Sequence, residues 1–121
     1  FGDSGGNIVN ISSIASTLNE SPYLVYNASK AAVDSITKTL SKELGKSKIR
    51  VNSINPGMVE TEGTHAMGVM DELRKQFEPH IALGRIGQPE DLTKALIFLV
   101  SDDSSWMTGE CMVISGGLLP F

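Results

Sequence analysis

Short apolar runs alternate with longer amphipathic stretches along the chain. Residues 8–11 (Ile-Val-Asn-Ile), 50–54 (Arg-Val-Asn-Ser-Ile) and 111–114 (Cys-Met-Val-Ile) are short and contain β-branched residues. Runs of this kind are typical of parallel strands that are covered on both faces. Pro56-Gly57 follows the second run and Gly116-Gly117 the third. We expect both pairs to end their strands, because proline cannot donate to a ladder and glycine favours turns.

The stretch from Leu24 to Leu44 is amphipathic with a helical period. Apolar side chains recur every four positions, while lysine and glutamate side chains lie elsewhere around the helix. The pattern predicts one long helix, ended by Gly45. Its predicted buried stripe is Ala32, Ile36, Leu40 and Leu44.

A second helix is predicted over residues 89–100. Pro89 suits the first helical position, and Glu90 and Asp91 complement the helix dipole. Its predicted buried stripe is Leu92, Ala95, Leu96 and Leu99. Residues 58–86 are less regular, and a long excursion after a strand commonly covers a ligand.

The alternation of strands and helices predicts an α/β fold with a parallel sheet. Strand, helix and strand in succession form a crossover unit. The 121 residues have room for one domain only, which we place over residues 1–121.

Composition excludes several classes of partner. The net charge is −4, with acidic and basic residues interspersed, so no basic stripe is available for nucleic acid or an anionic membrane. No apolar run reaches the roughly 18 residues of a membrane span, and the first residues do not resemble a signal peptide. A cytoplasmic protein is expected. His65, His80 and Cys111 lack metal-ligand spacing, so we expect no metal site and a buried Cys111.

Three side chains suggest proton-transfer chemistry. Tyr26 and Lys30 are four positions apart in a predicted helix and share one face. A free phenol titrates at about pH 10, and a neighbouring ammonium lowers that pKa toward neutrality, where tyrosine can give and accept protons. Ser13 follows the first strand, at the carboxyl end where open parallel sheets bind ligands. Any one of these features alone is common on a solvated surface.

The combination of these features is rare. Tyr26 follows Ser13 by 13 residues, and the next strand ends in Pro-Gly. The chain resembles the short-chain dehydrogenase/reductase family in residues 10–13 (Asn-Ile-Ser-Ser), 26–32 (Tyr-Asn-Ala-Ser-Lys-Ala-Ala) and 50–57 (Arg-Val-Asn-Ser-Ile-Asn-Pro-Gly). Residues 84–91, 108–110 and 116–117 are similar to the last helix and strand of the family. The resemblance covers nearly the whole chain.

The resemblance implies a role for each site residue. Tyr26 would be the general acid/base, Lys30 would tune it and hold the ribose hydroxyls of NAD or NADP, and Ser13 would polarise the carbonyl. The segment that begins at Pro56-Gly57 would reach the nicotinamide carboxamide through the backbone of Val59 and the hydroxyl of Thr61. The implied reaction interconverts a small-molecule carbonyl and a secondary alcohol, and the implied assembly is a homodimer or homotetramer.

The chain departs from the family pattern in its first half. No Gly-rich strand-to-helix turn is present, although this turn binds the pyrophosphate of a dinucleotide. The expectation is therefore the C-terminal half of a Rossmann-like, doubly wound fold (strands 5 to 7 of the parent), with an N-terminal half missing. Residues 57–64 are most similar to 3-oxoacyl-thioester reductases and glucose dehydrogenase-type members.

Two other functions stay open at this stage. A non-catalytic fragment, serving packing or oligomerisation, would explain the missing phosphate loop. A hydrolase with Ser13 as nucleophile and Lys30 as base is a third possibility, although the sequence contains no Gly-x-Ser-x-Gly elbow and Tyr26 would have no role.

Overall fold

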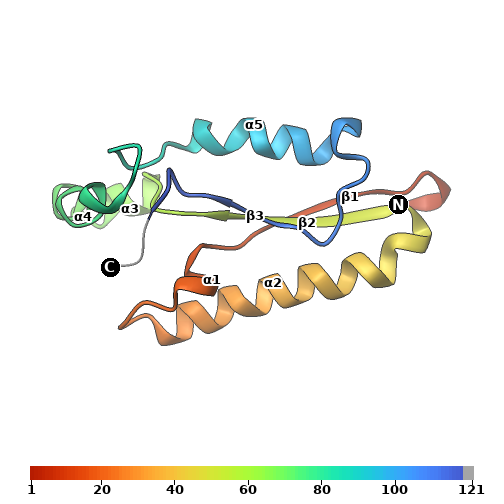
Figure 1. Ribbon diagram of the computed structural model, residues 1–121, viewed down its shortest axis with the longest axis horizontal. Helices are drawn as coiled ribbons and strands as arrows, with labels where there is room; N and C mark the ends of the chain where they lie inside the picture. Colours follow the sequence, from red (N-terminus) through yellow and green to blue (C-terminus); the bar gives the residue numbers. More distant parts are fainter. Residues whose placement is uncertain (119–121) are drawn as a thin grey trace.

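A computed structural model of the protein describes residues 1–118 and has an α/β architecture. One parallel sheet contains β1 (Gly6–Ile11), β2 (Ile49–Pro56) and β3 (Cys111–Ile114), in the order β1-β2-β3. Helix α2 (Leu24–Leu44) covers one face of the sheet, and α5 (Pro89–Val100) covers the other (Figure 1). The predicted strands and the two long helices are confirmed.

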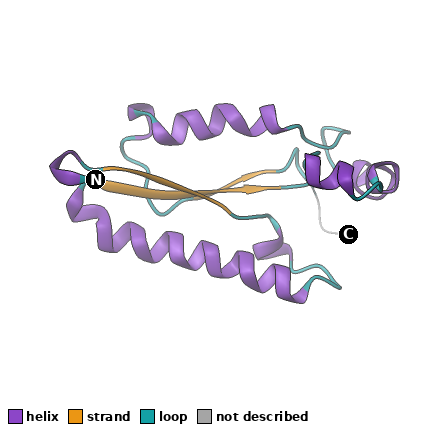
Figure 2. Cartoon of the chain, turned by 180° about the vertical axis from the view of Figure 1, so that it is seen from behind, coloured by secondary structure: helices purple, strands orange, loops and turns teal. Residues whose placement is uncertain are grey.

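Shorter elements connect these layers. Helices α3 (Glu62–Ala66) and α4 (Met70–Phe77) lie together beyond the carboxyl end of β2, where the N-terminal turns of α2 also lie (Figures 1 and 2). The other short elements are α1 (Ala15–Leu18) and the 3-10 helices η1 (Gly2–Ser4), η2 (Gly45–Ser47), η3 (Glu78–His80) and η4 (Asp102–Ser104).

The buried face of α2 differs from the predicted stripe. Ile36 is 51% exposed, and Ala32 is also exposed, whereas the buried side chains of this helix are polar. They are Asn27, Asp34, Thr37 and Ser41. Hydrogen bonds explain this burial: Asn10 Nδ2 of β1 donates to Thr37 Oγ1 over 2.9 Å, and Thr37 Oγ1 donates to the Val33 carbonyl. A pattern of apolar residues could not show which polar residues have such partners.

The stripe on α5 was only partly correct. Pro89 occupies the first turn, as predicted, and Leu99 is completely buried. Leu96 is 38% exposed, although it was assigned to the buried stripe. Phe98 is less exposed than Leu96 and lies one position before Leu99. The covered face of α5 therefore consists of Leu92, Ala95, Phe98 and Leu99, with Phe98 in place of Leu96.

The end of β2 and the end of α2 lie where they were predicted, but the local geometry at each is unexpected. Pro56 continues β2 and pairs with Ile114, because the hydrogen bond at this step is donated by Gly57 N to Ile114 O, over 2.9 Å. Proline is tolerated here because it is the last residue of its strand. At the end of α2, Gly45 has a right-handed φ of −59° and begins η2, and the left-handed residue is Lys48, with φ 58°.

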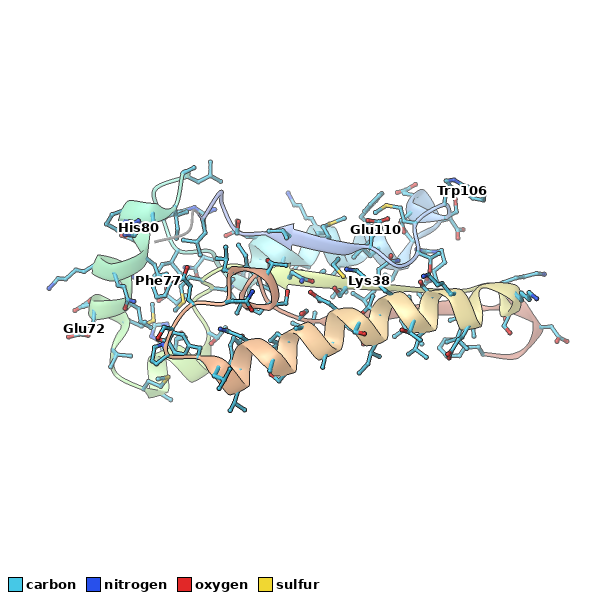
Figure 3. All side chains as sticks on the ribbon, turned by 60° about the horizontal axis from the view of Figure 1, so that its bottom comes forward. Lys38, Glu72, Phe77, His80, Trp106 and Glu110 are labelled. Carbon is cyan, nitrogen blue, oxygen red and sulfur yellow. The ribbon has the colours of Figure 1, made fainter. Side chains whose placement is uncertain are left out.

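An apolar cluster packs against α4. Ile81, Ile86 and Leu118 form its buried centre, and five further side chains pack against them: Ile14, Met58, Met70, Leu73 and Phe77. Figure 3 shows Phe77 at the end of the molecule that carries α4, with Trp106 at the opposite end. Met58 and Met70 thus act as core residues, whereas Met67 is 69% exposed. None of the helices within residues 1–118 is long and apolar enough to cross a membrane.

Candidate functional site

Ser13 lies two residues after β1, where the chain turns into α1. Its side chain is buried, and Oγ accepts the backbone N–H of Ala15 over 3.1 Å. A hydroxyl has one proton and two lone pairs, so the proton of Ser13 remains available for a ligand oxygen. Two backbone hydrogen bonds hold this segment against the end of β2: Ser12 N donates to Ile54 O over 2.8 Å, and Ile14 N donates to Pro56 O over 2.9 Å.

Tyr26 and Lys30 lie in the first two turns of α2, and Lys30 faces the end of β1. Lys30 Nζ is 5.7 Å from the centroid of the Tyr26 ring, within the roughly 6 Å of a cation–π contact. It also donates to the Ile11 carbonyl over 3.1 Å. Tyr26 is 48% exposed, so its ring is open to a ligand. The structure therefore brings both side chains to the carboxyl end of the strand that precedes Ser13.

The side chain of Ser12 is bonded to α2 and does not face the solvent. Its side chain is buried, and Oγ donates to the Lys30 carbonyl over 3.1 Å. This geometry gives Ser12 a structural role. It also argues against a Ser/Lys hydrolase, because Lys30 Nζ donates to a carbonyl and Ser13 Oγ accepts a backbone N–H, with no bond between the two side chains within residues 1–118.

Gly57 marks a close approach between two backbone segments. A Cβ at this position would lie 2.8 Å from both Cα and Cβ of Ser115, the residue after β3. Real Cβ contacts are essentially never this short. Gly57 is therefore required for packing against β3, in addition to any role beside a ligand.

The segment after Gly57 contains backbone N–H and C=O groups that its bridge to Gly87 does not use. Val59 forms an isolated parallel bridge with Gly87, in which Gly87 N donates to Met58 O over 3.0 Å and Glu60 N donates to Gly87 O over 2.9 Å. In a parallel bridge of this kind, the hydrogen bonds are formed by the residues on either side of Val59 and not by Val59 itself. The backbone polar groups of Val59 therefore face away from Gly87.

Thr61 begins α3 as its N-cap. Its Oγ1 accepts the backbone N–H of Thr64 over 3.3 Å, and Thr64 Oγ1 accepts the backbone N–H of Thr61 over 2.8 Å. The sequence contains little sign of this reciprocal cap, because the third helical position holds threonine and not the glutamate or glutamine of the usual capping box. The hydroxyl proton of Thr61 is not needed for the cap.

Glu60, between Val59 and Thr61, was also missed. Its carboxylate joins three segments: His65 Nε2 of α3 lies 2.9 Å from Oε1, while Arg74 Nη2 of α4 and Gln88 Nε2 before α5 lie 3.0 and 2.9 Å from Oε2. The hydrogen bonds from Gln88 and Arg74 lower the pKa of Glu60. Glu60 thus fixes the helical cover above the end of β2.

The remaining ionisable groups do not form a metal site. No group of three or more histidine, cysteine, aspartate or glutamate side chains within residues 1–118 is arranged to hold a metal ion. Cys111 is only partly buried, contrary to expectation.

Comparison with known proteins places these observations in context. Residues 2–119 match a family model described as enoyl-(acyl carrier protein) reductase. The chain is 41% identical over 113 residues to 3-oxoacyl-(acyl-carrier-protein) reductase of Chlamydia trachomatis, covering 93% of this chain and 45% of that protein.

Solved structures resemble the fold closely. A 7 alpha-hydroxysteroid dehydrogenase complexed with NADH and 7-oxo glycochenodeoxycholic acid matches with a TM-score of 0.89 and 32% identity, over 97% of this chain and 46% of that one. An NADPH-bound short chain oxidoreductase from Pseudomonas aeruginosa PAO1 matches with a TM-score of 0.84 and 28% identity, over 95% and 46%. The chain thus spans less than half the length of these relatives.

Proposed function

The chain belongs to the short-chain dehydrogenase/reductase family, and from this premise we propose that it carries the catalytic half of an oxidoreductase that uses NAD or NADP. The reaction interconverts a small-molecule carbonyl and a secondary alcohol. The observation that supports this most strongly is the position of Lys30 Nζ, 5.7 Å from the Tyr26 ring and 3.1 Å from the carbonyl of Ile11, two residues before Ser13.

Tyr26 supplies the proton in the proposed reaction. When a carbonyl substrate is reduced, Tyr26 Oη gives its proton to the substrate oxygen, and in the reverse direction it accepts the proton of the alcohol. Ser13 Oγ donates its free proton to the same oxygen and orients the carbonyl beside the phenol. Lys30 holds a positive charge near the ring, which favours the phenolate that forms during reduction. A nicotinamide cofactor, when bound, would supply or accept the hydride.

The donor set of the chain fits a nicotinamide nucleotide. The hydroxyl of Tyr26 and the ammonium of Lys30 suit ribose hydroxyls. The backbone N–H and C=O of Val59 face away from their bridge partner, and Thr61 keeps a hydroxyl proton, so both suit a carboxamide. Pro56 and Gly57 fix the start of this segment against β3.

The chain corresponds in this proposal to the C-terminal half of a Rossmann-like, doubly wound fold, strands 5 to 7, in a single partial domain over residues 1–121. An N-terminal half would supply the Gly-rich turn for the pyrophosphate. Exposed apolar side chains on α2, such as Val25 (80%) and Ile36 (51%), support a homodimer or homotetramer. A cytoplasmic location is part of the same proposal.

The alternative is a fragment without turnover that serves packing or oligomerisation. These 121 residues lack the Gly-rich turn that binds the pyrophosphate, and this favours the non-catalytic alternative for the chain by itself. The two functions differ in cofactor binding, which therefore decides between them.

The test begins with the intact mass of the purified protein, followed by titration of the same sample with NADH and NADPH. Turnover is then measured with a 3-oxoacyl thioester and with a 7-oxo steroid, the compounds that the related proteins suggest. We expect saturable binding of one cofactor and its oxidation in the presence of a ketone. If the protein binds neither NADH nor NADPH, that result would support the non-catalytic alternative.

A further inference from the structure

Asp34 is a buried carboxylate that the proposed proton transfer does not use. It lies on α2, four residues after Lys30 and eight after Tyr26, and is 8% exposed. This spacing places it on the same helix face as both residues. Within residues 1–118, no basic side chain pairs with it. A buried charge without a counter-ion is costly unless hydrogen bonds replace its hydration.

Polar side chains from several segments surround the carboxylate of Asp34. The amide Nδ2 of Asn55, near the end of β2, lies 3.0 and 2.9 Å from the two carboxylate oxygens. The side chains of Ser12 after β1, Ser16 in α1 and Cys111 at the start of β3 also lower the pKa of this carboxylate. Burial alone would raise the pKa of Asp34, but these hydrogen bonds outweigh it and hold the pKa below its usual value of 3.8. Asp34 is therefore an anion at neutral pH.

Asn55 connects the carboxylate of Asp34 to the turn that contains Ser13. Its side chain is 1% exposed, and its Oδ1 accepts the hydroxyl of Ser53 over 2.6 Å, which fixes the orientation of the amide. Nδ2 therefore points toward the carboxylate of Asp34 and lies 3.4 Å from the Ser13 carbonyl. One amide group thus contacts both the helix that carries Tyr26 and the turn that carries Ser13.

We propose that Asp34 is a positioning residue for proton transfer, which acts through Asn55 to hold the Ser13 turn in register with Tyr26 and Lys30. This inference rests on the proposed function. A hydrophobic side chain could fill the same space on α2 but could not orient the amide of Asn55. The carboxylate therefore sets the geometry of a site that it does not touch.

The test compares the unsubstituted protein with Asp34→Asn, Asn55→Asp and the exchanged double variant Asp34→Asn/Asn55→Asp. The exchange restores one amide facing one carboxylate, so it should recover the thermal midpoint that Asn55→Asp loses through repulsion between two carboxylates. It cannot restore the donor to the Ser13 carbonyl, because a carboxylate does not donate a hydrogen bond. We therefore expect a stable double variant whose kcat stays low, on the order of 10- to 100-fold below the unsubstituted protein, with KM little changed.

The outcomes separate two kinds of failure. If the double variant recovers both stability and kcat, or if Asp34→Asn lowers the thermal midpoint and leaves kcat unchanged, Asp34 has a merely structural role and the inference is wrong. If the unsubstituted protein itself shows neither cofactor binding nor turnover, the proposed function fails and the inference fails with it.

Discussion

At the scale of single residues, the surroundings of two glycines show whether a glycine is required at each position. Gly45 was expected to end α2, but its φ of −59° is right-handed and a Cβ there would meet no atom within 4 Å. Gly57 has no unusual dihedral angle to explain it, yet a Cβ there would lie 2.8 Å from Ser115. The second glycine is required by packing, whereas the first is not required at all.

The two glycines therefore predict opposite effects of alanine. Gly45→Ala should raise the free energy of unfolding by about 0.4–1 kcal/mol, because it restricts the unfolded chain without strain in the folded one. Gly57→Ala should lower that free energy by about 1–3 kcal/mol, because the backbone at Ser115 must move. Urea unfolding followed by circular dichroism measures both. Equal midpoints for the two variants would contradict this account.

At the scale of elements, Glu60 connects the cover formed by α3 and α4 to the rest of the molecule. Its carboxylate contacts a side chain from α3, one from α4 and one before α5, namely His65, Arg74 and Gln88. Because its pKa is lowered in the folded protein, these contacts are complete above the ordinary pKa of 4.5 and are lost as the pH falls through the lower folded value.

Glu60→Gln should therefore loosen the cover at neutral pH. We expect faster amide hydrogen exchange in residues 62–77, after correction for intrinsic rates, and no further loss of protection as the pH falls below 4.5. Glu72→Gln, an exposed substitution on α4, is the matched control. Unchanged protection in Glu60→Gln would show that the apolar contacts of Leu73 and Phe77 hold the cover without Glu60.

The elements themselves were largely predictable, but their orientation was not. Helix α2 begins and ends where the sequence indicated, at Leu24 and Leu44, because the amphipathic period extends over its whole length. The prediction of its buried face was wrong, since Asp34 and Thr37 are buried and have hydrogen-bond partners on strands that are distant in sequence. Hydrogen-bond partners that are far apart in sequence leave no periodic signal.

At the scale of the whole molecule, the proposed site lies at one end of the sheet, where β1 and β2 end and α2 begins (Figure 1). The sequence predicted a site of Ser13, Tyr26 and Lys30 at this edge, because the carboxyl ends of parallel strands share it, and the structure places Lys30 beside Tyr26 and beside the end of β1. It did not predict Asp34, Asn55 or Glu60, whose importance depends on contacts among several elements.

Substitution of Tyr26 tests the central claim most directly. Tyr26→Phe removes only the hydroxyl that transfers the proton, and Tyr23→Phe, a substitution of a similarly exposed tyrosine just before α2, is the control. We predict that Tyr26→Phe lowers kcat by roughly 10²- to 10⁴-fold, keeps the thermal midpoint and still binds the cofactor, while Tyr23→Phe keeps its turnover. Turnover of Tyr26→Phe equal to that of Tyr23→Phe would contradict the account.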